Sequence, residues 1–553
     1  MTQNTSDPSL LSTGLSGFSN IRKRGMVYVD KTAILYQFAR LRIPIFLSRP
    51  RRFGKSLLVN TLESLFFKGL DDFRGLDIDT LWNDTTYRVI HLDFSSMSSC
   101  TPRGLRRKLA DDLVQCFDVK DKVALTDSLN CYRDPDEVLK EILRPLKDNS
   151  IVLLIDEYDA PITHHMKVTS ANDSDLHEIL SILQGFYAAV KQYVDRFRHI
   201  FITGITRIAH VSIFSAFNNL KDISLDAKYN ALLGFTQEEI ENNFSPYVEH
   251  AAHVLGRSRQ GILTALKDRY DGYRFSLDAP GTVCPPWSVL NFFMDPELGF
   301  QNYWFESGGT PSLLMNFIKM RENFFLREYA KQKFSTTVHQ LKAKYEVQGI
   351  PPEILFTQAG YLTLQRQSQT RAELVFPNTE VAESLLQLAL TIEGMSISDT
   401  TYDDCDLLVE YIDRRNLDKI IDVFNRILVD CSSSKSVIFS DELSVRDLIF
   451  AAIPSMRNLL KNKERANALG ISDLELTTKR THMVIEFTRT YPPKSHGEER
   501  RDAEKSLNQG IAQMMSRKYA MKFPDLPLYR VVMVIGTCER QILPEFCREV
   551  SEE

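Results

Sequence analysis

Residues 45–60 read IFLSRPRRFGKSLLVN, and this stretch decides how the N-terminal third of the chain is interpreted. Its first letters form an apolar run, and its last letters continue at helical spacing after GKS at 54–56. Strand, loop and helix in this order are the context of a phosphate-binding loop, G-x-x-x-x-G-K-S/T, with backbone N–H groups facing the phosphates. Arg49 stands where that pattern has its first glycine. A strand-to-helix turn with a solvated basic tip is therefore the alternative interpretation.

The bulk composition is that of an ordinary protein with more than one domain. The chain has 553 residues, 43% hydrophobic and 25% charged, with a net charge of −5, and such a length exceeds one core. This balance argues against a generally basic nucleic-acid coat protein but is compatible with a local basic groove. The eight cysteines form no C-x-x-C pair, which favours reduced thiols. Without a leader pattern or a run of about 18 apolar residues, we expect a soluble cytoplasmic protein with no membrane span.

A second stretch, IVLLIDEYD at 151–159, is an uninterrupted apolar run that ends in acids, as is typical of a buried parallel strand. Ligands of open α/β sheets lie at the carboxyl ends of strands, where the loop and these acids would meet. We expect Lys55 to contact the β and γ phosphates, and Ser56 and Asp156 to hold Mg²⁺. Glu157 is expected to orient or deprotonate an attacking water.

A third apolar strand, 199–204, is followed by Thr206 and Arg207. An arginine at this strand tip is suited to sensing or stabilising a γ-phosphate, and pairing with a nearby acid is the alternative. Asp159 is interpreted as a helix cap or solvated acid. A further apolar strand at 89–94 gives four predicted strands separated by helical patterns. This order predicts an α/β fold with a doubly wound parallel sheet of the ATPase type.

The loop resembles that of the AAA-ATPase-like family, which writes it RPRRFGKS. Other landmarks of that family lie between about residues 15 and 310, among them YVDK at 28–31, IDEYD at 155–159, TGITR at 203–207, IFSAFNNL at 213–220 and YDGYRF at 270–275. The resemblance implies a P-loop NTPase domain with a RecA-like sheet that binds ATP. We expect nucleotide contacts from Arg49, Pro50, Arg51, Arg52, Phe53, Gly54, Lys55, Ser56, Asp156 and Arg207.

The chain is expected to divide into a polar tail (1–14), an AAA-ATPase-like domain (15–235), a helical bridge or lid (236–405) and a C-terminal domain (406–553). The bridge carries aromatic residues whose spacing is more typical of a core than of a stacking site. We interpret this region as a connection that reports the nucleotide state.

In the C-terminal domain an amphipathic helix at 444–460 precedes two strands, a helix at about 500–519 and a strand at 529–535. The two strands place Asp473 and Glu486 as a pair of acids. This order is the layout of the PD-(D/E)XK nuclease fold. Such acids hold Mg²⁺ or Mn²⁺, and the metal activates water and stabilises charge on a scissile phosphate.

The C-terminal acids, with Glu464 before them and Gln509 after, resemble the nuclease-superfamily domain usually fused to this ATPase. That domain has Glu-x-Lys on its second strand, and Thr488 occupies the lysine position here. The neighbouring Arg489 points to the opposite face of a strand. The other cations that could supply the charge are Lys479 and Lys505.

Two functions follow from these patterns. In the first, an ATPase is coupled to a nuclease-like domain that acts on or binds DNA or RNA, with cleavage doubtful because Thr488 is uncharged. In the second, the alternative, the chain is a nucleotide-gated binding or regulatory protein whose nuclease domain is inactive. Both functions require ATP and Mg²⁺ at the N-terminal site.

Overall fold

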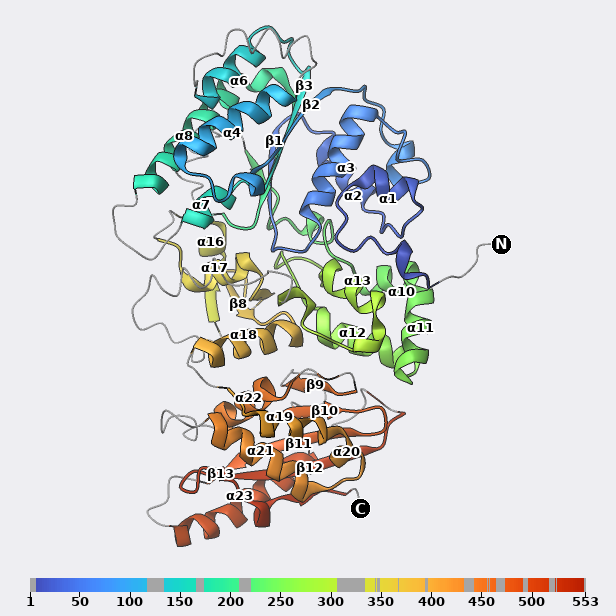
Figure 1. The fold of residues 1–553 in the computed structure, drawn as a ribbon, viewed down its shortest axis with the longest axis vertical. Helices are drawn as coiled ribbons and strands as arrows, with labels where there is room; N and C mark the ends of the chain where they lie inside the picture. The colour runs from blue at the N-terminus through green and yellow to red at the C-terminus, as the bar shows by residue number, and fades with distance from the viewer. Residues whose placement is uncertain are drawn as a thin grey trace.

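The computed structural model describes residues 6–116, 134–165, 174–207, 220–305, 334–343, 345, 349–366, 368–392, 396–431, 442–454, 456, 458–463, 473–490, 496–516, 523 and 525–551. Three parts are stacked along the longest axis of the molecule, and they follow one another in chain order (Figure 1). The N-terminal and C-terminal parts each contain a sheet flanked by helices, and a mostly helical part lies between them.

The N-terminal part contains a five-stranded, all-parallel sheet in the order β2-β3-β4-β1-β5. Its strands are β1 (Pro44–Ser48), β2 (Arg88–Asp93), β3 (Ile151–Asp156), β4 (Phe197–Gly204) and β5 (Lys221–Asp222). Strands β1, β3 and β4 are buried along their whole length, which explains their largely unbroken apolar sequences. The four predicted strands are confirmed, and β5 is an additional edge strand. Because β4 lies between β1 and β3, the chain after β4 lies between the loop after β1 and the acids that end β3.

Helices cover both faces of this sheet (Figure 1). One face carries α1 (Phe18–Lys23), α2 (Thr32–Ala39) and α3 (Lys55–Lys68), and the other carries α4 (Pro102–Gln115), α6 (Pro135–Leu143) and α8 (Ser174–Gln192). The short helix α7 (Ala160–His165) follows the acids at the end of β3. This arrangement is the doubly wound α/β fold that the sequence predicts.

The middle part is mostly helical, as predicted, but it also contains a small antiparallel sheet in the order β6-β8-β7. The strands are β6 (Phe334–Thr337), β7 (Thr363–Arg366) and β8 (Arg371–Val375). They are short and partly polar, so their sequence signal is weak. The helices are α10 (Gln237–Asn243), α11 (Ser245–Leu255), α12 (Arg259–Tyr270), α13 (Pro286–Met294), α16 (Val338–Lys342), α17 (Pro352–Ala359) and α18 (Thr379–Ile392).

The N-terminal segment packs on the helices of the middle part from Ser6 onward, although the sequence predicts a polar tail over 1–14. Leu11 is buried in the same apolar cluster as residues of α11 and α13. The Tyr247 hydroxyl donates to the Asp7 carbonyl at 2.9 Å. Residues 6–14 are thus part of the fold, and the chain runs from them into the N-terminal sheet domain.

The C-terminal part has four helices followed by a mixed sheet in the order β13-β12-β11-β10-β9, with β14 paired to β12. The helices are α19 (Asp399–Asp406), α20 (Leu408–Asp413), α21 (Leu417–Cys431) and α22 (Glu442–Ala452). The strands are β9 (Leu460–Lys463), β10 (Leu474–Thr477), β11 (His482–Arg489), β12 (Leu528–Gly536), β13 (Gln541–Ile542) and β14 (Arg548–Glu549). Helix α23 (His496–Ser516) connects the parallel pair β11 and β12.

The predicted order of helix, strands, helix and strand is present in this part, with one correction. The helix predicted over 444–460 ends at Ala452, and Leu460 begins β9 instead. Pro454 explains the early end, because proline excludes the helical conformation from the residue before it. In the sheet, alternate residues face opposite helices: Ile485 and Phe487 belong to the core shared with α21 and α22, and Val532 and Val534 pack with α23.

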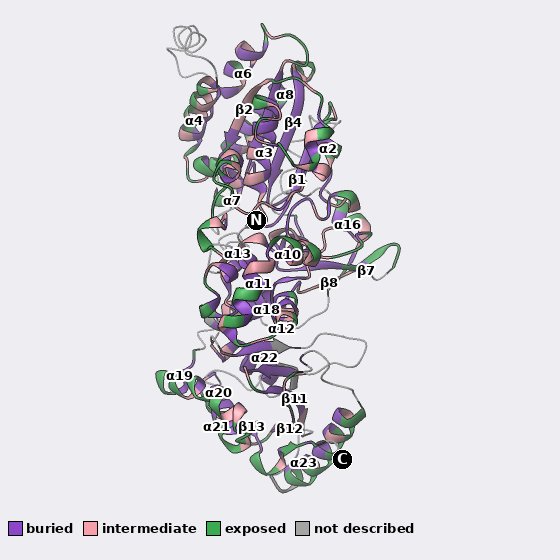
Figure 2. Ribbon diagram, turned by 90° about the vertical axis from the view of Figure 1, so that its right-hand side faces the viewer, coloured by how far each residue is buried: buried purple, intermediate pink, exposed green. Residues whose placement is uncertain are grey.

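A buried ionic network joins the middle part to the C-terminal sheet. Glu383 of α18 pairs with Arg269 of α12 at 2.7 Å and with Lys461 of β9 at 2.8 Å, and all three side chains are at most 2% exposed. Burial alone would raise the pKa of Glu383, but Lys461 and Arg269 outweigh it and lower the pKa to about 2. Figure 2 shows that the strands of both large sheets are buried and that the outer faces of their helices are exposed. Across the described part of the chain, no helix combines the length and apolar character needed to cross a bilayer.

Candidate functional site

The basic loop, residues 49–54, connects β1 to α3 and ends in a left-handed turn. Gly54 has φ of +94° and caps the N-terminus of α3, a conformation that costs glycine little because it has no Cβ. Arg52 adopts φ of +68°, which is unusual for a residue with a side chain. Such backbone is found where the surrounding structure enforces it, often at ligand sites. The loop therefore turns sharply onto the N-terminus of α3.

Lys55 is the first residue of α3, and its side chain is enclosed by the basic loop. The residue is 5% exposed, and its ammonium donates to the carbonyls of Arg49 at 3.1 Å and Pro50 at 3.0 Å. Burial lowers the pKa of Lys55, against the opposing attraction of Glu157 and Asp156. The loop thus holds a buried cation beside the acids of β3.

Ser56 and Asp156 bring two oxygen donors together. The Ser56 hydroxyl hydrogen-bonds the Asp156 carboxylate, which ends β3 and is 3% exposed. Burial raises the pKa of Asp156, while Ser56 and Lys55 oppose that rise. A hydroxyl and a carboxylate in contact are hard oxygen ligands of the kind that Mg²⁺ prefers. These two residues fit a magnesium ion.

Glu157 follows Asp156 in a strained position and faces a cavity. Its φ is +48°, and it lines a cavity of about 670 Å³ together with Arg51, Arg52 and Lys55. Burial raises the pKa of Glu157, Lys55 opposes that rise, and Asp156 adds to it. A carboxyl whose pKa is moved upward is better suited to accept a proton near neutral pH.

Asp159 has a structural role that the sequence did not reveal. Its carboxylate accepts from the Thr206 N–H at 2.7 Å, the Thr206 hydroxyl at 2.6 Å and the Ile205 N–H at 3.2 Å. These bonds tie the end of β3 to the end of β4. A Cβ on Gly204 would lie 2.5 Å from Asp159 Oδ1 and from the Tyr158 ring, so this approach requires glycine. In the sequence, the only sign of this contact is that IDEYD and TGITR both stand at the ends of predicted strands.

Arg49 and Pro50 are expected to contact nucleotide, but the structure turns the Arg49 side chain away from the large cavity. Its guanidinium donates to the carbonyls of Ser48, Ser224 and Tyr229 at 2.8–3.0 Å, and it lies 4.1 Å from the centre of the Phe275 ring. Both residues line a separate small cavity. Burial lowers the pKa of Arg49 to about 9. In this arrangement Arg49 holds the loop to the domain rather than facing the large cavity.

Arg207, expected at the γ-phosphate, is likewise engaged elsewhere. It pairs with Asp222 of β5 at 2.6 Å, and its guanidinium donates to the Leu341 carbonyl of α16 at 2.6 Å. Its backbone N–H donates to Gln358 of α17 at 2.8 Å. The arginine therefore has the acid partner of the alternative interpretation, and it connects the end of β4 to the middle part.

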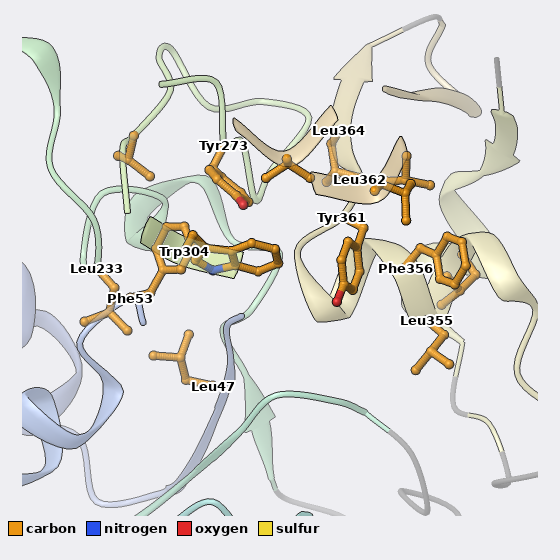
Figure 3. Packing of buried hydrophobic residues seen from close by; sticks show 14 of the residues in the cluster. Leu47, Phe53, Leu233, Tyr273, Trp304, Leu355, Phe356, Tyr361, Leu362 and Leu364 are labelled. Carbon is orange, nitrogen blue, oxygen red and sulfur yellow. The ribbon is translucent and has the colours of Figure 1, made fainter. Parts of the chain in front are cut away.

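Three aromatic anchors hold the outer half of the loop. Phe53 is buried against Tyr273, with ring centres 4.8 Å apart. The Trp304 indole N–H donates to the Arg51 carbonyl at 3.1 Å, and the Arg52 guanidinium lies 4.1 Å from the centre of the Trp287 ring. Figure 3 shows Phe53, Tyr273 and Trp304 in one region of the packed core. Aromatic residues of the middle part therefore contact the basic loop directly.

Comparison with known proteins agrees with this geometry. A family model described as predicted AAA-ATPase, AAA-ATPase-like, matches residues 12–214. An uncharacterized protein in the vnfD 5' region of Azotobacter chroococcum mcd 1 is 32% identical over 389 residues, which cover 69% of this chain and 70% of the relative. The chain belongs to the AAA-ATPase-like family. The alignment with the relative is longer than the match to the family model, so the likeness continues beyond the ATPase-like domain.

In this AAA-ATPase-like protein the second pair of predicted acids lies in the C-terminal sheet. Asp473 precedes β10, and its carboxylate accepts from the Phe487 N–H at 2.7 Å. Glu486 is 2% exposed, and its carboxylate accepts from the Gln513 amide of α23. The register that pairs Leu474 with Ile485 brings the two acids to the same end of the hairpin.

An arginine lies near one of these acids. Arg446 of α22 lies 3.8 Å from the Asp473 carboxylate, and its main pairing is with Asp447 at 2.8 Å. Within the described residues, no group of three or more His, Cys, Asp or Glu side chains could hold a metal ion. Glu464, which the predicted pattern places before these acids, lies outside the described residues. The described residues therefore supply two acids of the predicted pattern, and a metal ion at this pair stays a prediction.

Thr488 occupies the position that the predicted pattern assigns to lysine. The Thr488 hydroxyl is buried without a hydrogen-bond partner among the described residues, and a Cβ on Gly510 of α23 would lie 2.9 Å from its methyl group. Lys505 lies on the exposed face of α23, and Lys479 lies in the turn at the far end of the hairpin.

The structure also corrects the expected glutamine. Gln509 is exposed on the outer face of α23, and Gln513, one turn later, reaches Glu486. The 3.6-residue periodicity of the helix, with Ala503, Leu507 and Met514 facing the sheet, was the signal that could have separated the two.

Proposed function

We propose that this protein binds ATP at the large cavity beside the basic loop and hydrolyses it. The observation that carries the proposal is the meeting of Lys55, the Ser56–Asp156 pair and Glu157 at the N-terminus of α3. Phosphates are favoured at a helix N-terminus, where unpaired N–H groups and the helix dipole act together. Membership of the AAA-ATPase-like family supports the same assignment.

Each residue has a role that its surroundings support. Lys55 would leave its loop carbonyls to contact the β and γ phosphates. Bound Mg²⁺, held by Ser56 and Asp156, would neutralise charge on those phosphates. Glu157 would accept the proton of the attacking water, a role that its raised pKa favours. Buried surroundings strengthen all of these electrostatic interactions relative to water.

We further propose that nucleotide binding is coupled to the C-terminal part through α18. Trp304 donates through its indole to the Arg51 carbonyl of the basic loop and through its backbone N–H to Glu380 of α18 at 2.7 Å. One helical turn later, Glu383 pairs with Lys461 of the C-terminal sheet. A movement of the basic loop would therefore be transmitted to β9 through Glu380 and Glu383, two side chains of the same helix.

For the C-terminal part we propose a PD-(D/E)XK-like domain that binds nucleic acid or another partner without cleaving it. The order of α22, β9–β11, α23 and β12 supports the layout. Thr488 lies at the position expected for lysine and is covered by α23 at Gly510, so the cation that would stabilise a pentacoordinate phosphate is absent from that position. This geometry favours the nucleotide-gated binding protein over the nuclease.

Equilibrium binding of Mg-ATP by calorimetry tests the first proposal. Lys55→Ala is expected to weaken binding by at least about a hundredfold, because it removes the cation nearest the phosphates. Lys68→Ala is the matched control: this lysine belongs to the same helix but pairs with Asp72 at the surface. Equal affinity in wild type and Lys55→Ala would refute the nucleotide site.

Nuclease activity is tested by incubating DNA and RNA with Mg²⁺ or Mn²⁺ and comparing wild type with Glu486→Ala. We expect no cleavage that depends on Glu486, and retention of nucleic acid in a gel-shift assay. Cleavage by wild type but not by the variant would show that the acids work without a lysine at 488. Equal cleavage by both proteins would indicate a contaminating nuclease.

A further inference from the structure

The small cavity lined by Arg49 and Pro50 lies where the N-terminal sheet meets the middle part. Its volume is about 50 Å³, and none of the described residues that line it also lines the large cavity. One wall comes from the ends of β1 and β4, and the opposite wall comes from residues 274–275, α17 and β7. A space of this size holds about three or four water molecules, or one small oxyanion.

Hydrogen-bond donors without acceptors are present in the walls of this small cavity. Three arginines and no acidic residue are among the described residues that line it. Arg49 and Arg207 are 1% and 7% exposed, and the Nε of each is buried without a hydrogen-bond partner in the described part of the chain. Arg274 contributes a third, half-buried arginine. Because buried donors are normally paired with an acceptor, these walls are suited to a ligand that supplies one.

The charges of the buried arginines also favour an anion. Arg207 pairs with Asp222 at 2.6 Å. Asp222 also attracts Arg49, but burial outweighs this attraction and lowers the pKa of Arg49 to about 9. A buried cation that lacks sufficient counter-charge is costly. An anion in the small cavity would reduce this cost at both arginines.

Two uncharged side chains add donors to the same walls. The Gln358 side-chain oxygen accepts from the Arg207 N–H at 2.8 Å, and the Ser224 hydroxyl oxygen accepts from the Ser48 N–H at 2.8 Å. These bonds leave the amide N–H groups of Gln358 and the O–H of Ser224 as donors to a ligand. Several donors around a small volume match an ion that carries several acceptor oxygens, and arginine is well suited to phosphate.

We propose that the small cavity is a binding site for inorganic phosphate, held by Arg49, Arg207 and Arg274. The bound ion would connect the N-terminal sheet, which supplies the first two arginines, to the middle part, which supplies Arg274 and Gln358. The site is separate from the nucleotide site, and the inference holds whether or not the protein hydrolyses ATP.

The test is calorimetric titration of the full chain with inorganic phosphate, at an ionic strength held constant with sodium chloride. Arg274→Met is expected to weaken phosphate binding at least about tenfold, because a charge-assisted hydrogen bond is lost. Arg371→Met is the control: this arginine of β8 is exposed and does not line the cavity, so affinity should change less than about twofold. Thermal unfolding of each variant checks that the fold is retained.

A second variant tests the site without removing an arginine. Gln358→Glu keeps an oxygen that accepts from the Arg207 N–H, but it places a negative charge in the wall of the cavity. It should also weaken phosphate binding at least about tenfold, because like charges repel in buried surroundings. Lys55→Ala should bind phosphate as wild type does, since Lys55 lines the large cavity.

The possible outcomes separate this inference from the proposed function. No phosphate binding by wild type, as expected if the cavity holds only water, would overturn the inference. Equal affinity in wild type, Arg274→Met and Gln358→Glu would also overturn it. Loss of phosphate binding in Lys55→Ala would place the ion at the proposed nucleotide site, which would overturn the inference and leave the proposed function intact.

Discussion

Two pairs of acids, one in each large sheet, are alike in sequence and differ in what surrounds them. Asp156 and Glu157 end a parallel strand, and beside them lie a buried ammonium, a serine hydroxyl and a cavity. Asp473 precedes β10 and Glu486 lies in the adjacent strand β11, and their carboxylates accept from the Phe487 N–H and the Gln513 amide. The difference teaches that paired acids need their surroundings to be interpreted: the first pair lies beside a buried lysine and a large cavity, and the second lies beside Arg446, which pairs mainly with Asp447.

Isosteric substitution of one acid in each pair is expected to give the largest contrast. Glu157→Gln should lower the ATP turnover rate by about a thousandfold while Mg-ATP still binds, because the variant cannot accept a proton. Glu486→Gln should leave ATP turnover unchanged. Steady-state hydrolysis and calorimetry together measure both effects. Full turnover by Glu157→Gln would show that Glu157 is not the base, and it would contradict the proposed difference between the two pairs of acids.

Arg49 sharpens the distinction between holding the loop and contacting nucleotide. Arg49→Met leaves three buried carbonyls without their donor and should lower the free energy of unfolding by about 3 kcal/mol. Arg107→Met is the control, because that arginine is 70% exposed in a surface pair and should change stability by less than about 0.5 kcal/mol. Denaturant unfolding measures both. A stable Arg49→Met protein that had lost only ATP affinity would restore the nucleotide role.

Glu380 tests the helix that joins the two regions through the pH dependence of stability. Burial raises its pKa from 4.5 to about 7, so its contribution to stability is fully present below about pH 4.5 and is lost as pH rises through 7. Glu380→Gln should therefore match wild type near pH 5 and be more stable by about 2 kcal/mol near pH 8. A difference that does not change with pH would contradict this. Glu383→Gln should act in the opposite direction at pH 7, because it leaves Arg269 and Lys461 without their charged partner.

The smallest expected effect concerns the helix that covers the C-terminal acids. A Cβ on Gly510 would lie 2.6 Å from Val532 and 2.9 Å from Thr488, so Gly510→Ala should destabilise the protein by about 1 kcal/mol. Gly185→Ala, in α8, meets only ordinary contacts near 3.8 Å and should stabilise by about 0.5–1 kcal/mol. Chemical unfolding of both variants measures these changes in the free energy of unfolding. Stabilisation by Gly510→Ala would show that α23 does not press on Thr488.

Much of the fold could be predicted because burial leaves a direct mark on sequence. The unbroken apolar runs at 44–48 and 151–156 predicted strands, and the acids at the end of β3 predicted which edge of the sheet carries the candidate site. The short strands β5, β6 and β7 carry too few residues for periodicity to show. The early end of α22 was predictable in principle from Pro454.

The candidate site was predictable in its residue types but not in the direction of its side chains. Arg49 and Arg207 look identical in sequence to arginines that bind phosphate, and only tertiary packing turns them toward carbonyls and Asp222. Gln513 was missed in favour of Gln509 because the phase of α23 relative to the sheet is set by Gly510, Leu507 and Met514. The full extent of the cavity was missed because its N-terminal lining residues, within 12–31, lie more than 200 residues from those at 232–235 in sequence.

ATP turnover by wild type, Lys55→Ala and Glu486→Ala, measured side by side, tests the central claim most directly. The account predicts that turnover requires Lys55, whose ammonium lies beside Glu157 and the Ser56–Asp156 pair, and that Glu486→Ala turns over ATP as wild type does. Turnover that survives Lys55→Ala, or that is lost in Glu486→Ala, would contradict it.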